Sequence, residues 1–457
     1  MNIGKTVAGE IARWFVMRED LAASDKGRLL AARAILDTLA CAYAGRGDQT
    51  LAKVASVVAQ GAGAAPLMTG GQADPAMAAM VNGTAAHVLD FDDNFAPGMS
   101  HASAVIVPAL LAVADTQTSG RRLIDAYLIA LQAQAFVGDG LGAGHYTAGW
   151  HGTSTVGSIG TAAGVAWLLG GDEEAIRRAL TLGCSFASGT KGQFGTPAKP
   201  FHAGLAARNA VEAARLALAG LEGHALAFEG PQGLAEMFRG PSTPGYDLAR
   251  IAGTDAHVIE TIGVVPKLHP CCGSTHFVID ALADLRKLHD IDPDQVLAIR
   301  THVGIANLRN LPYIHPVNEM EARFSMTYCM ARALRAGRLT LQDFTPKALA
   351  DHAKDPLLDR LTMTAWSPEE EAAALPARLP HQLRLMMADG RILEASRLVP
   401  RGAISDPFTL AEMREKFIAC CEDAPWAAAL FDSGQSLDLW PDLRPFSALF
   451  SGSDSPR

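Results

Sequence analysis

A cluster of titratable side chains interrupts an otherwise apolar stretch, AAHVLDFDDNFAPGMSHAS, at residues 85–103. Only 19% of the residues in the chain are charged, yet this stretch gathers five titratable groups: His87, Asp90, Asp92, Asp93 and His101. Such groups could ligate a metal ion, exchange protons or, for the aspartates, cap a helix. The stretch by itself leaves these three interpretations open.

Four further stretches combine polar side chains with glycine or proline. They are GHYTAGWHGTSTVG (144–157) with Tyr146 and His151, GTPAKPFHAGLAARN (195–209) with Lys199 and His202, PKLHPCCGSTH (266–276) with Lys267, and a helix expected over 321–337 with Arg323 and Tyr328. Any one of these side chains has an ordinary explanation, such as a hydrogen-bonded core histidine or a solvated lysine. Their recurrence at breaks between apolar segments indicates a site, because loops on a rigid scaffold carry most functional groups.

The elements that must position these residues are mostly helical up to residue 264. Alanine, leucine and glycine dominate this part, with the apolar spacing of helices, and alternation typical of strands is scarce. We expect helices over 27–44, 104–118, 121–137, 158–170 and 205–223, the last ending near Gly220 or Gly223. The sequence therefore predicts a large all-helical domain over residues 1–264.

The pattern changes near residue 264. VLAIRTHVG (296–304) is typical of a strand, and HQLRLMMADGRILEASRL (381–398) is typical of a hairpin that turns at Asp389-Gly390. We therefore expect a mainly α fold, with a smaller α+β domain over 265–403 and a C-terminal segment over 404–457 that returns to the helical domain. The last seven residues, SGSDSPR, are expected to be frayed.

Composition argues against nucleic acid and a membrane as partners. The formal net charge is −9 and no block of Lys and Arg occurs, so nucleic acid is not an expected partner. The apolar run at 104–114 is too short to span a bilayer, and the first twenty residues lack a secretory apolar run. We therefore expect a cytoplasmic protein with no membrane partner.

Cofactor sites are also poorly supported by the sequence. The seven cysteines are odd in number and form no CxxC pair, which argues against a disulfide framework and an iron–sulfur site. GDGLGA (138–143) fits a loose dinucleotide pattern, but the residues before it are typical of a helix rather than a strand. We expect no nicotinamide or flavin.

Five motifs occur in order over nearly the whole chain: HVLDFDD followed by a histidine, GWHGTSTVG, AKPFHAGLAARNAVEAARLA, PKLHPCCGSTH and EARFSMTYCMA. With these motifs the chain resembles the MmgE/PrpD family, which includes 2-methylcitrate dehydratase, cis-aconitate decarboxylase and iminodisuccinate epimerase. The resemblance implies a helical domain, an α+β lid domain and an active site between them, usually in a homodimer. It also implies small di- or tricarboxylate substrates and neither a cofactor nor a metal.

The family's functional positions transfer through these motifs. The resemblance implies six catalytic residues: Asp90, His101, His151, Lys199, Lys267 and Tyr328. Four neighbours are expected to bind substrate: Asn94, Tyr146, His202 and Arg323. Within this set we expect Asp90 and His101 to work as a pair, with Asp92 and Asp93 as helix caps or supporting groups.

These residues suit proton abstraction next to a carboxylate. The lysines would hold carboxylates, the histidines would exchange protons near neutral pH, and cations would stabilise enolate-like charge in a pocket closed to water. A lyase, either dehydratase or decarboxylase, is the first expectation. An epimerase of an amino-dicarboxylate is the alternative, because Asn94 and Ala102 depart from residues common in the family. An inactive carboxylate-binding homologue is the non-enzymatic alternative.

A metal site is the competing interpretation of the same side chains. His101, His151 and the aspartates at 90, 92 and 93 offer nitrogen and oxygen ligands. No compact ligand motif such as HExxH occurs, and the resemblance implies catalysis without metal. We therefore expect no metal requirement.

Overall fold

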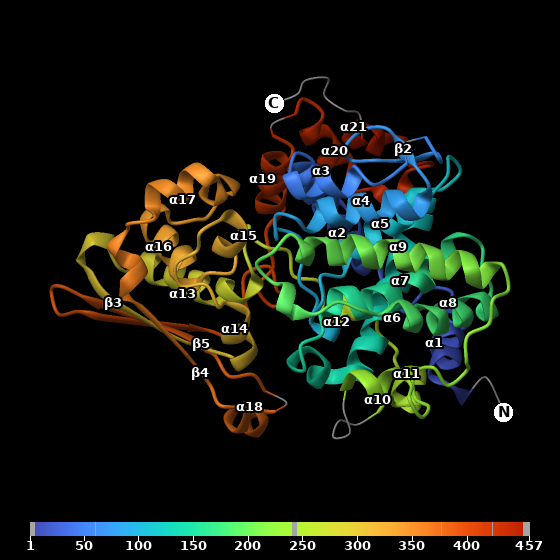
Figure 1. Ribbon diagram of the computed structural model, residues 1–457, viewed down its shortest axis with the longest axis horizontal. Coiled ribbons are helices and arrows are strands. Elements are labelled where there is room, and N and C mark those ends of the chain that lie inside the picture. The colour runs from blue at the N-terminus through green and yellow to red at the C-terminus, as the bar shows by residue number, and fades with distance from the viewer. Residues whose placement is uncertain (1–4, 60, 240–244, 376, 423, 451–457) are drawn as a thin grey trace.

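The computed structural model describes residues 5–59, 61–239, 245–375, 377–422 and 424–450. The frayed end expected at 451–457 lies outside these residues. Figure 1 shows a large body of packed helices beside a smaller unit in which helices pack on a twisted sheet. The expected mainly α fold with a smaller α+β part is confirmed.

The helical body is built from the first 261 residues. Its helices are α1 (Val7–Val16), α2 (Asp25–Gly45), α3 (Gln49–Ala55), α4 (Pro75–His87), α5 (Ser103–Val113), α6 (Gly120–Thr147), α7 (Gly152–Leu168), α8 (Glu173–Phe186), α9 (Ala198–Leu218), α10 (Leu234–Arg239), α11 (Leu248–Ala252) and α12 (Val258–Thr261). Two very short strands, β1 (Ala65–Pro66) and β2 (Gln72–Ala73), pair antiparallel. Side-chain caps set several helix starts: Ser24 accepts from the Gly27 amide before α2, and Ser119 accepts from the Arg122 amide before α6.

The expected helices of this body are present, with shifted ends. The expected helix 104–118 ends at Val113, and α9 begins at Ala198, seven residues before its expected start at 205. Helix α6 kinks within the GDGLGA stretch at Gly142, whose φ is 65°, and the residues before these glycines form a helix and not a strand. The helix expected before them is confirmed, and it argues against a dinucleotide site.

Helices α4 and α9 approach each other unusually closely. A Cβ added at Gly204 would lie 2.1 Å from the Met80 carbonyl oxygen, and one at Gly83 would lie 2.9 Å from the Gly204 Cα. Only glycine fits at such a crossing, because any side chain would push the two backbones apart. The close approach brings the end of α4 next to the start of α9.

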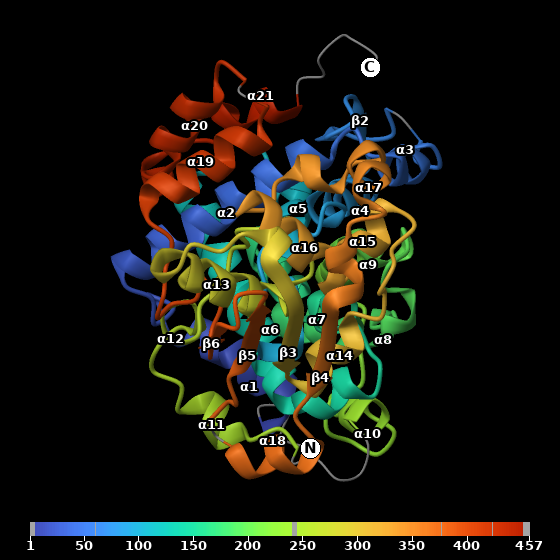
Figure 2. The same cartoon turned by 90° about the vertical axis from the view of Figure 1, so that its left-hand side faces the viewer.

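The smaller unit, here called the lid, contains a four-stranded sheet in the order β4-β3-β5-β6. Its elements are α13 (Gly273–Leu288), β3 (Val296–Val303), α14 (Ile305–Asn310), α15 (Glu319–Ala322), α16 (Met326–Ala336), α17 (Pro346–His352), β4 (Leu361–Ala365), α18 (Pro368–Ala374), β5 (His381–Met387) and β6 (Ile392–Arg397). Strand β4 is parallel to β3, and the other two pairings are antiparallel. Gly390, at φ 87°, turns the hairpin where the sequence predicts it. Figure 2 looks directly at the lid, with the helical body behind it.

The prediction of a single helix over 321–337 is wrong. The segment forms α15 and α16 with a break between them, and the Ser325 hydroxyl starts α16 by accepting from the Tyr328 amide at 3.1 Å. Arg323 therefore caps the C-terminal end of α15, whereas Tyr328 lies in α16. The serine cap explains the break, because its hydroxyl satisfies an amide that a continuous helix would bond to a carbonyl.

Two apolar cores correspond to these two bodies. One joins residues between Val7 and Ile259 with residues between Phe417 and Leu449, and the other lies in the lid together with Phe194 of the helical body. The C-terminal helices are α19 (Leu410–Cys420), α20 (Ala427–Gly434) and α21 (Ser447–Phe450). Helices α19 and α20 pack against α2, and Figure 1 shows them in red beside the blue N-terminal helices. No helix among the described residues has the length and apolarity needed to cross a membrane.

Candidate active site

The candidate site starts from Asp90, which follows α4 in an uncommon backbone conformation. Its φ is 50°, in the left-handed region that non-glycine residues seldom adopt. Its amide donates to the His87 carbonyl at 3.1 Å, which closes a tight turn at the end of the helix. Strained backbone of this kind persists where surrounding contacts hold it, and it is concentrated at functional sites.

Two buried lysines converge on the Asp90 carboxylate. The Lys199 ammonium, in the first turn of α9, and the Lys267 ammonium, from the segment before α13, each donate to Asp90 Oδ1 at 2.8 Å. Lys267 also donates to the Asp90 carbonyl at 2.8 Å. Burial raises the pKa of Asp90, but the two ammonium groups outweigh it and hold that pKa well below its ordinary value. The three groups together carry one net positive charge.

His87 is the next partner of Lys199. The Lys199 ammonium lies 2.9 Å from His87 Nε2, and because an ammonium has no lone pair, the imidazole must accept. His87 Nδ1 then carries the proton and donates to the Asp92 carboxylate, 2.9 Å from both oxygens. Burial lowers the pKa of His87, which agrees with a neutral ring in this tautomer. Asp92 thus orients His87, and His87 orients Lys199.

The hydrogen-bond partner of His101 also determines which of its ring nitrogens carries the proton. Its Nδ1 lies 2.8 Å from the Asp93 carbonyl oxygen, which can only accept, so Nδ1 carries the proton. The His101 amide donates to Thr153 Oγ1 at 3.0 Å, which ties this loop to α7. Burial and then the nearby Lys267 lower the pKa of His101 well below its ordinary value. The ring is therefore neutral, with the lone pair on Nε2.

His151 comes from the residue before α7 and faces a second imidazole. Its Nδ1 lies 3.1 Å from His202 Nδ1, so one ring donates and the other accepts. Burial and then the nearby Lys199 lower the pKa of His151, and burial lowers that of His202 to about 4. His151 Nε2 is buried and has no hydrogen-bond partner among the described residues. That nitrogen is free to exchange a proton with a ligand.

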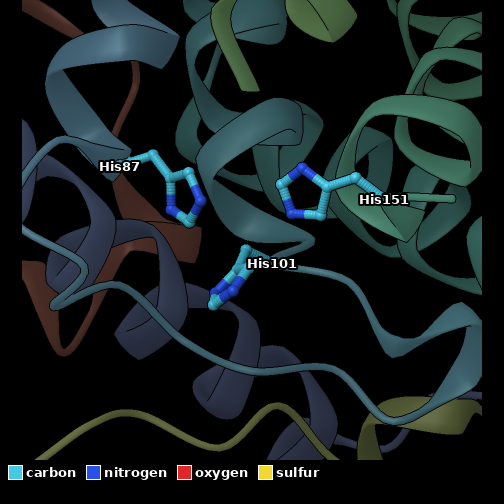
Figure 3. Close-up of side chains that lie close together, drawn as sticks. All are labelled: His87, His101 and His151. Carbon is cyan, nitrogen blue, oxygen red and sulfur yellow. The ribbon is translucent and has the colours of Figure 1, made fainter. Parts of the chain in front are cut away.

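Three imidazoles thus gather around one point, as Figure 3 shows for His87, His101 and His151. Their ring centroids are 4.4 to 6.3 Å apart, and one nitrogen of each lies within 4.8 Å of the others. This spacing could hold a metal ion. However, the Lys199 ammonium already donates to His87 Nε2, and a third cation beside the ammonium groups of Lys199 and Lys267 would be strongly repelled. The two ammonium groups fit an anionic ligand better than a metal.

Aromatic rings from both bodies enclose the Lys199 ammonium. It lies 5.5 Å from the Phe194 ring centroid and 5.1 Å from that of Phe324, which the lid contributes. The His151 ring contacts Phe194 edge-on at 5.0 Å. The lid is held there in part by Tyr313, whose hydroxyl donates to the Phe194 carbonyl at 3.0 Å. Such a wall excludes water and strengthens the electrostatic interactions inside it.

Several polar groups in this enclosure still lack partners. Each ammonium of Lys199 and Lys267 uses two of its three N–H groups, which leaves one on each. Asp90 Oδ2 and His151 Nε2 are buried and unpaired among the described residues. Buried polar groups without partners cost free energy, so this arrangement is what a polar ligand would complete.

Asp90 and His101 make no direct hydrogen bond in the part of the chain that the structure describes. Asp90 pairs with two lysines, and His101 bonds to the backbone of Asp93. One Asp90 oxygen and one His101 ring nitrogen still lie within 4.8 Å of each other, so their work as a pair stays a prediction. Asp92 accepts from His87 rather than from a helix-start amide, whereas Asp93 accepts from the Ser103 hydroxyl and from the Ser103 amide at the start of α5.

Two expected site residues of the lid have their contacts inside the lid. The Tyr328 hydroxyl donates to the Asp343 carbonyl, and its ring lies 5.9 Å from that of Phe344. The Arg323 guanidinium donates to the Glu319 carbonyl at 3.2 Å and lies over the Phe344 ring. Arg323 also lies close enough to Asp90 for the two charges to interact, and its Nε is buried without a partner among the described residues. The structure therefore brings Arg323, but not Tyr328, near the lysines, and the roles of both stay predictions.

Asn94 and Tyr146 lie where the helical body meets the lid. The Asn94 backbone pairs with that of Val265 through two hydrogen bonds of 2.8 Å, and its side chain packs against Gly273. The Tyr146 hydroxyl accepts from the Asn310 amide at 2.9 Å, and the Lys191 ammonium lies 3.5 Å from the Tyr146 ring centroid. Both residues join the two bodies, and direct substrate contact stays a prediction for them.

Sequence reasoning named His87 in the titratable cluster but left it out of the expected site residues, and it gave Asp92 too little weight. The signal was present, since His87 stands immediately before the acidic motif, at the end of a helix rich in small residues. The acidic motif drew attention to its aspartates. Nothing local indicated that a lysine 112 residues away would bond to His87.

Two family models match most of the chain. Residues 10–247 match the MmgE/PrpD N-terminal domain, and residues 269–428 match the MmgE/PrpD C-terminal domain. Cis-aconitate decarboxylase from Mus musculus is 29% identical over 329 residues, which covers 68% of this chain and 66% of that protein. The one from Homo sapiens is 31% identical over 59% of this chain and 57% of that protein. The matches thus span just under two thirds of the mouse protein and less of the human one.

A fungal relative extends the similarity over more of the chain. Cis-aconitate decarboxylase from Aspergillus terreus is 25% identical over 449 residues, which covers 93% of this chain and 88% of that protein. The N-terminal family model alone accounts for more than half of the 457 residues, and the C-terminal model for most of the rest. The chain therefore belongs to the MmgE/PrpD family.

Proposed function

We propose that this protein is a lyase that acts on a small di- or tricarboxylate, with decarboxylation of a cis-aconitate-like substrate as the first candidate. The observation that carries the proposal is the Asp90 carboxylate held between two buried ammonium groups, with neutral histidines beside it. The names of the relatives support decarboxylation in particular.

Substrate carboxylates would be recognised by the lysines. Lys199 and Lys267 each have one N–H left, and Asp90 holds both ammonium groups in place. A substrate anion would accept these hydrogens and balance the net positive charge of the three groups. Because the site is buried, this interaction is stronger than the same contact in water.

Decarboxylation then needs charge stabilisation and one proton. The bond between a carboxylate carbon and its neighbour breaks, CO₂ leaves, and the electron pair stays on the neighbouring carbon. The lysines stabilise this charge as it spreads into a remaining carboxylate. The proton that replaces CO₂ would come from His151 Nε2, which carries a hydrogen when His151 Nδ1 accepts from His202, and solvent would restore it. His101, whose Nε2 has a lone pair, would accept a proton rather than supply one.

The experiment is an NMR assay in D₂O with four substrates: cis-aconitate, citrate, 2-methylcitrate and iminodisuccinate. We expect CO₂ release from cis-aconitate with one deuterium incorporated in the product. Loss of water from citrate or 2-methylcitrate would assign a dehydratase instead. Deuterium uptake by iminodisuccinate without net conversion would assign an epimerase, and binding without turnover would assign an inactive homologue.

Metal independence and assembly are proposed with the function. Activity should survive EDTA, since two ammonium groups occupy the place where a metal would bind. Activity that EDTA abolishes and one metal restores would overturn this part of the proposal. The homodimer implied by the family is checked by light scattering after size-exclusion chromatography.

A further inference from the structure

A third buried lysine lies outside the group that would bind substrate. Lys416, on α19 of the C-terminal segment, is only 3% exposed. Its ammonium lies 2.8 and 3.0 Å from the Asp37 carboxylate oxygens on α2. It also donates to the Phe91 carbonyl at 2.8 Å and lies 4.2 Å from the Phe91 ring centroid.

Unlike Lys199 and Lys267, Lys416 has no open side for a ligand. A carboxylate, a carbonyl and an aromatic face surround its ammonium. Burial lowers the pKa of Lys416, but the Asp37 carboxylate outweighs it and keeps the ammonium charged. Lys416 is therefore built to hold its partners in place rather than to exchange a proton.

The partner that matters is the Phe91 carbonyl, because Phe91 stands next to Asp90. Two consecutive carbonyls, of Asp90 and Phe91, each accept a hydrogen bond of 2.8 Å from a buried lysine. Lys267 holds the first and Lys416 the second. The turn between them contains the left-handed backbone of Asp90, a conformation that persists only when its surroundings hold it.

We propose that Lys416 is a positioning residue for catalysis: with Asp37 it clamps the Phe91 carbonyl and so fixes the Asp90 turn that holds Lys199 and Lys267. The C-terminal segment thereby supports the active site through α19. The inference rests on the proposed function for its catalytic consequence, whereas the clamp itself is testable without turnover.

The experiment compares Lys416→Met with Lys416→Arg, and with Lys416→Met/Asp37→Asn, which removes both charges and leaves no unpaired buried carboxylate. A matched control is Phe417→Leu, which weakens the packing of the same helix against the core without touching the Phe91 carbonyl. A second control, Arg414→Met, removes an exposed ion pair of α19 to Asp432.

With cis-aconitate, Lys416→Met and the double variant should lower kcat about tenfold to a hundredfold with little change in KM, because a small displacement of catalytic groups is costly. Lys416→Arg, which keeps a charged donor, should recover part of the rate. Both controls should keep kcat within about threefold of wild type. Loss of rate in Phe417→Leu equal to that in Lys416→Met would show a merely structural role and overturn the proposal.

Hydrogen exchange of residues 88–95 separates this inference from the proposed function. Lys416→Met and the double variant should raise exchange of that segment by about tenfold, whereas Phe417→Leu should raise it only in α19. This readout holds even if wild type converts none of the four substrates. Unchanged exchange at 88–95 in both Lys416 variants would overturn the clamp.

Discussion

The helical body and the lid contribute to the candidate site in different ways. The helical body places its side chains at helix ends: His87 closes α4, His151 precedes α7 and Lys199 stands in the first turn of α9. The lid side contributes Lys267, from the segment before α13, and the ring of Phe324. Most polar groups of the site thus lie where long packed helices begin and end, whereas the lid side adds one lysine and an aromatic ring that helps to close the space.

This difference explains why the family motifs predicted the positions of some site residues better than those of others. Motif residues at the ends of long packed helices lie close together as expected. The close packing of α4 and α9 fixes the relative positions of their ends. Motif residues on the short lid helices have their contacts inside the lid, as with Tyr328 and Asp343. Four predictions test this contrast.

The largest effects are expected on the helical side. Lys199→Ala and His151→Ala should each lower kcat/KM by about a hundredfold or more, because they remove a cation and a proton carrier from a buried site. Circular dichroism should show unchanged folding. The exposed Lys53 provides a matched control, and Lys53→Ala should leave kcat/KM unchanged. Near-normal turnover in both variants would contradict the assignment of Lys199 and His151 to the active site.

Two buried carboxyls, one in each body, predict a pH dependence of stability. Burial raises the pKa of Asp93 to about 7 and that of Asp280, in α13, to about 6. The folded state therefore binds more protons than the unfolded state between about pH 4 and these values. The contribution of each carboxyl is greatest below about pH 4 and is lost as pH rises towards the folded pKa.

Urea unfolding at pH 5 and pH 8 measures this effect. The unfolding free energy of wild type should fall between these pH values. Asp93→Asn should reduce that fall by roughly 2 to 3 kcal/mol, and Asp280→Asn by roughly 1 kcal/mol. The helical-body carboxyl should thus dominate. Equal slopes in wild type and both variants would mean that neither carboxyl is protonated in the folded protein.

A smaller catalytic effect is expected at His87, the residue that links Asp92 to Lys199. His87→Ala should lower kcat about tenfold, because Lys199 loses the acceptor that orients it but keeps Asp90. His87→Gln, whose amide can both accept and donate, should recover part of the rate. Steady-state kinetics with the best substrate checks this, and an unchanged kcat in His87→Ala would contradict the orienting role.

The smallest effect is expected in the lid. Tyr328→Phe should change kcat by less than about threefold and lower the unfolding free energy by about 1 kcal/mol, since it removes one buried hydrogen bond to Asp343. Kinetics and urea unfolding on the same preparation measure both. A hundredfold loss of kcat would instead show that Tyr328 turns towards the substrate during the reaction. The lid helices would then contribute to catalysis as the helical body does.

Much of the fold could be predicted from the sequence, because the signals for helices and turns lie in neighbouring residues. Apolar spacing located the long helices, and Gly390 located the lid hairpin. The break at Ser325 was missed, although a serine cap is a local signal, because the helical spacing continues across it. The early end of α5, at Val113 rather than 118, was missed in the same way.

The sequence by itself determined the family, the mainly α fold and most of the residues that gather at the site. Only the tertiary structure decided which lysines are buried, which carboxylate each one meets and which nitrogen of each assigned histidine carries the proton. Lys199 meets Asp90 across 109 residues, Lys267 across 177, and Lys416 meets Phe91 across 325. Charge and protonation depend on such distances and on exclusion of water, and both arise only when distant segments pack together.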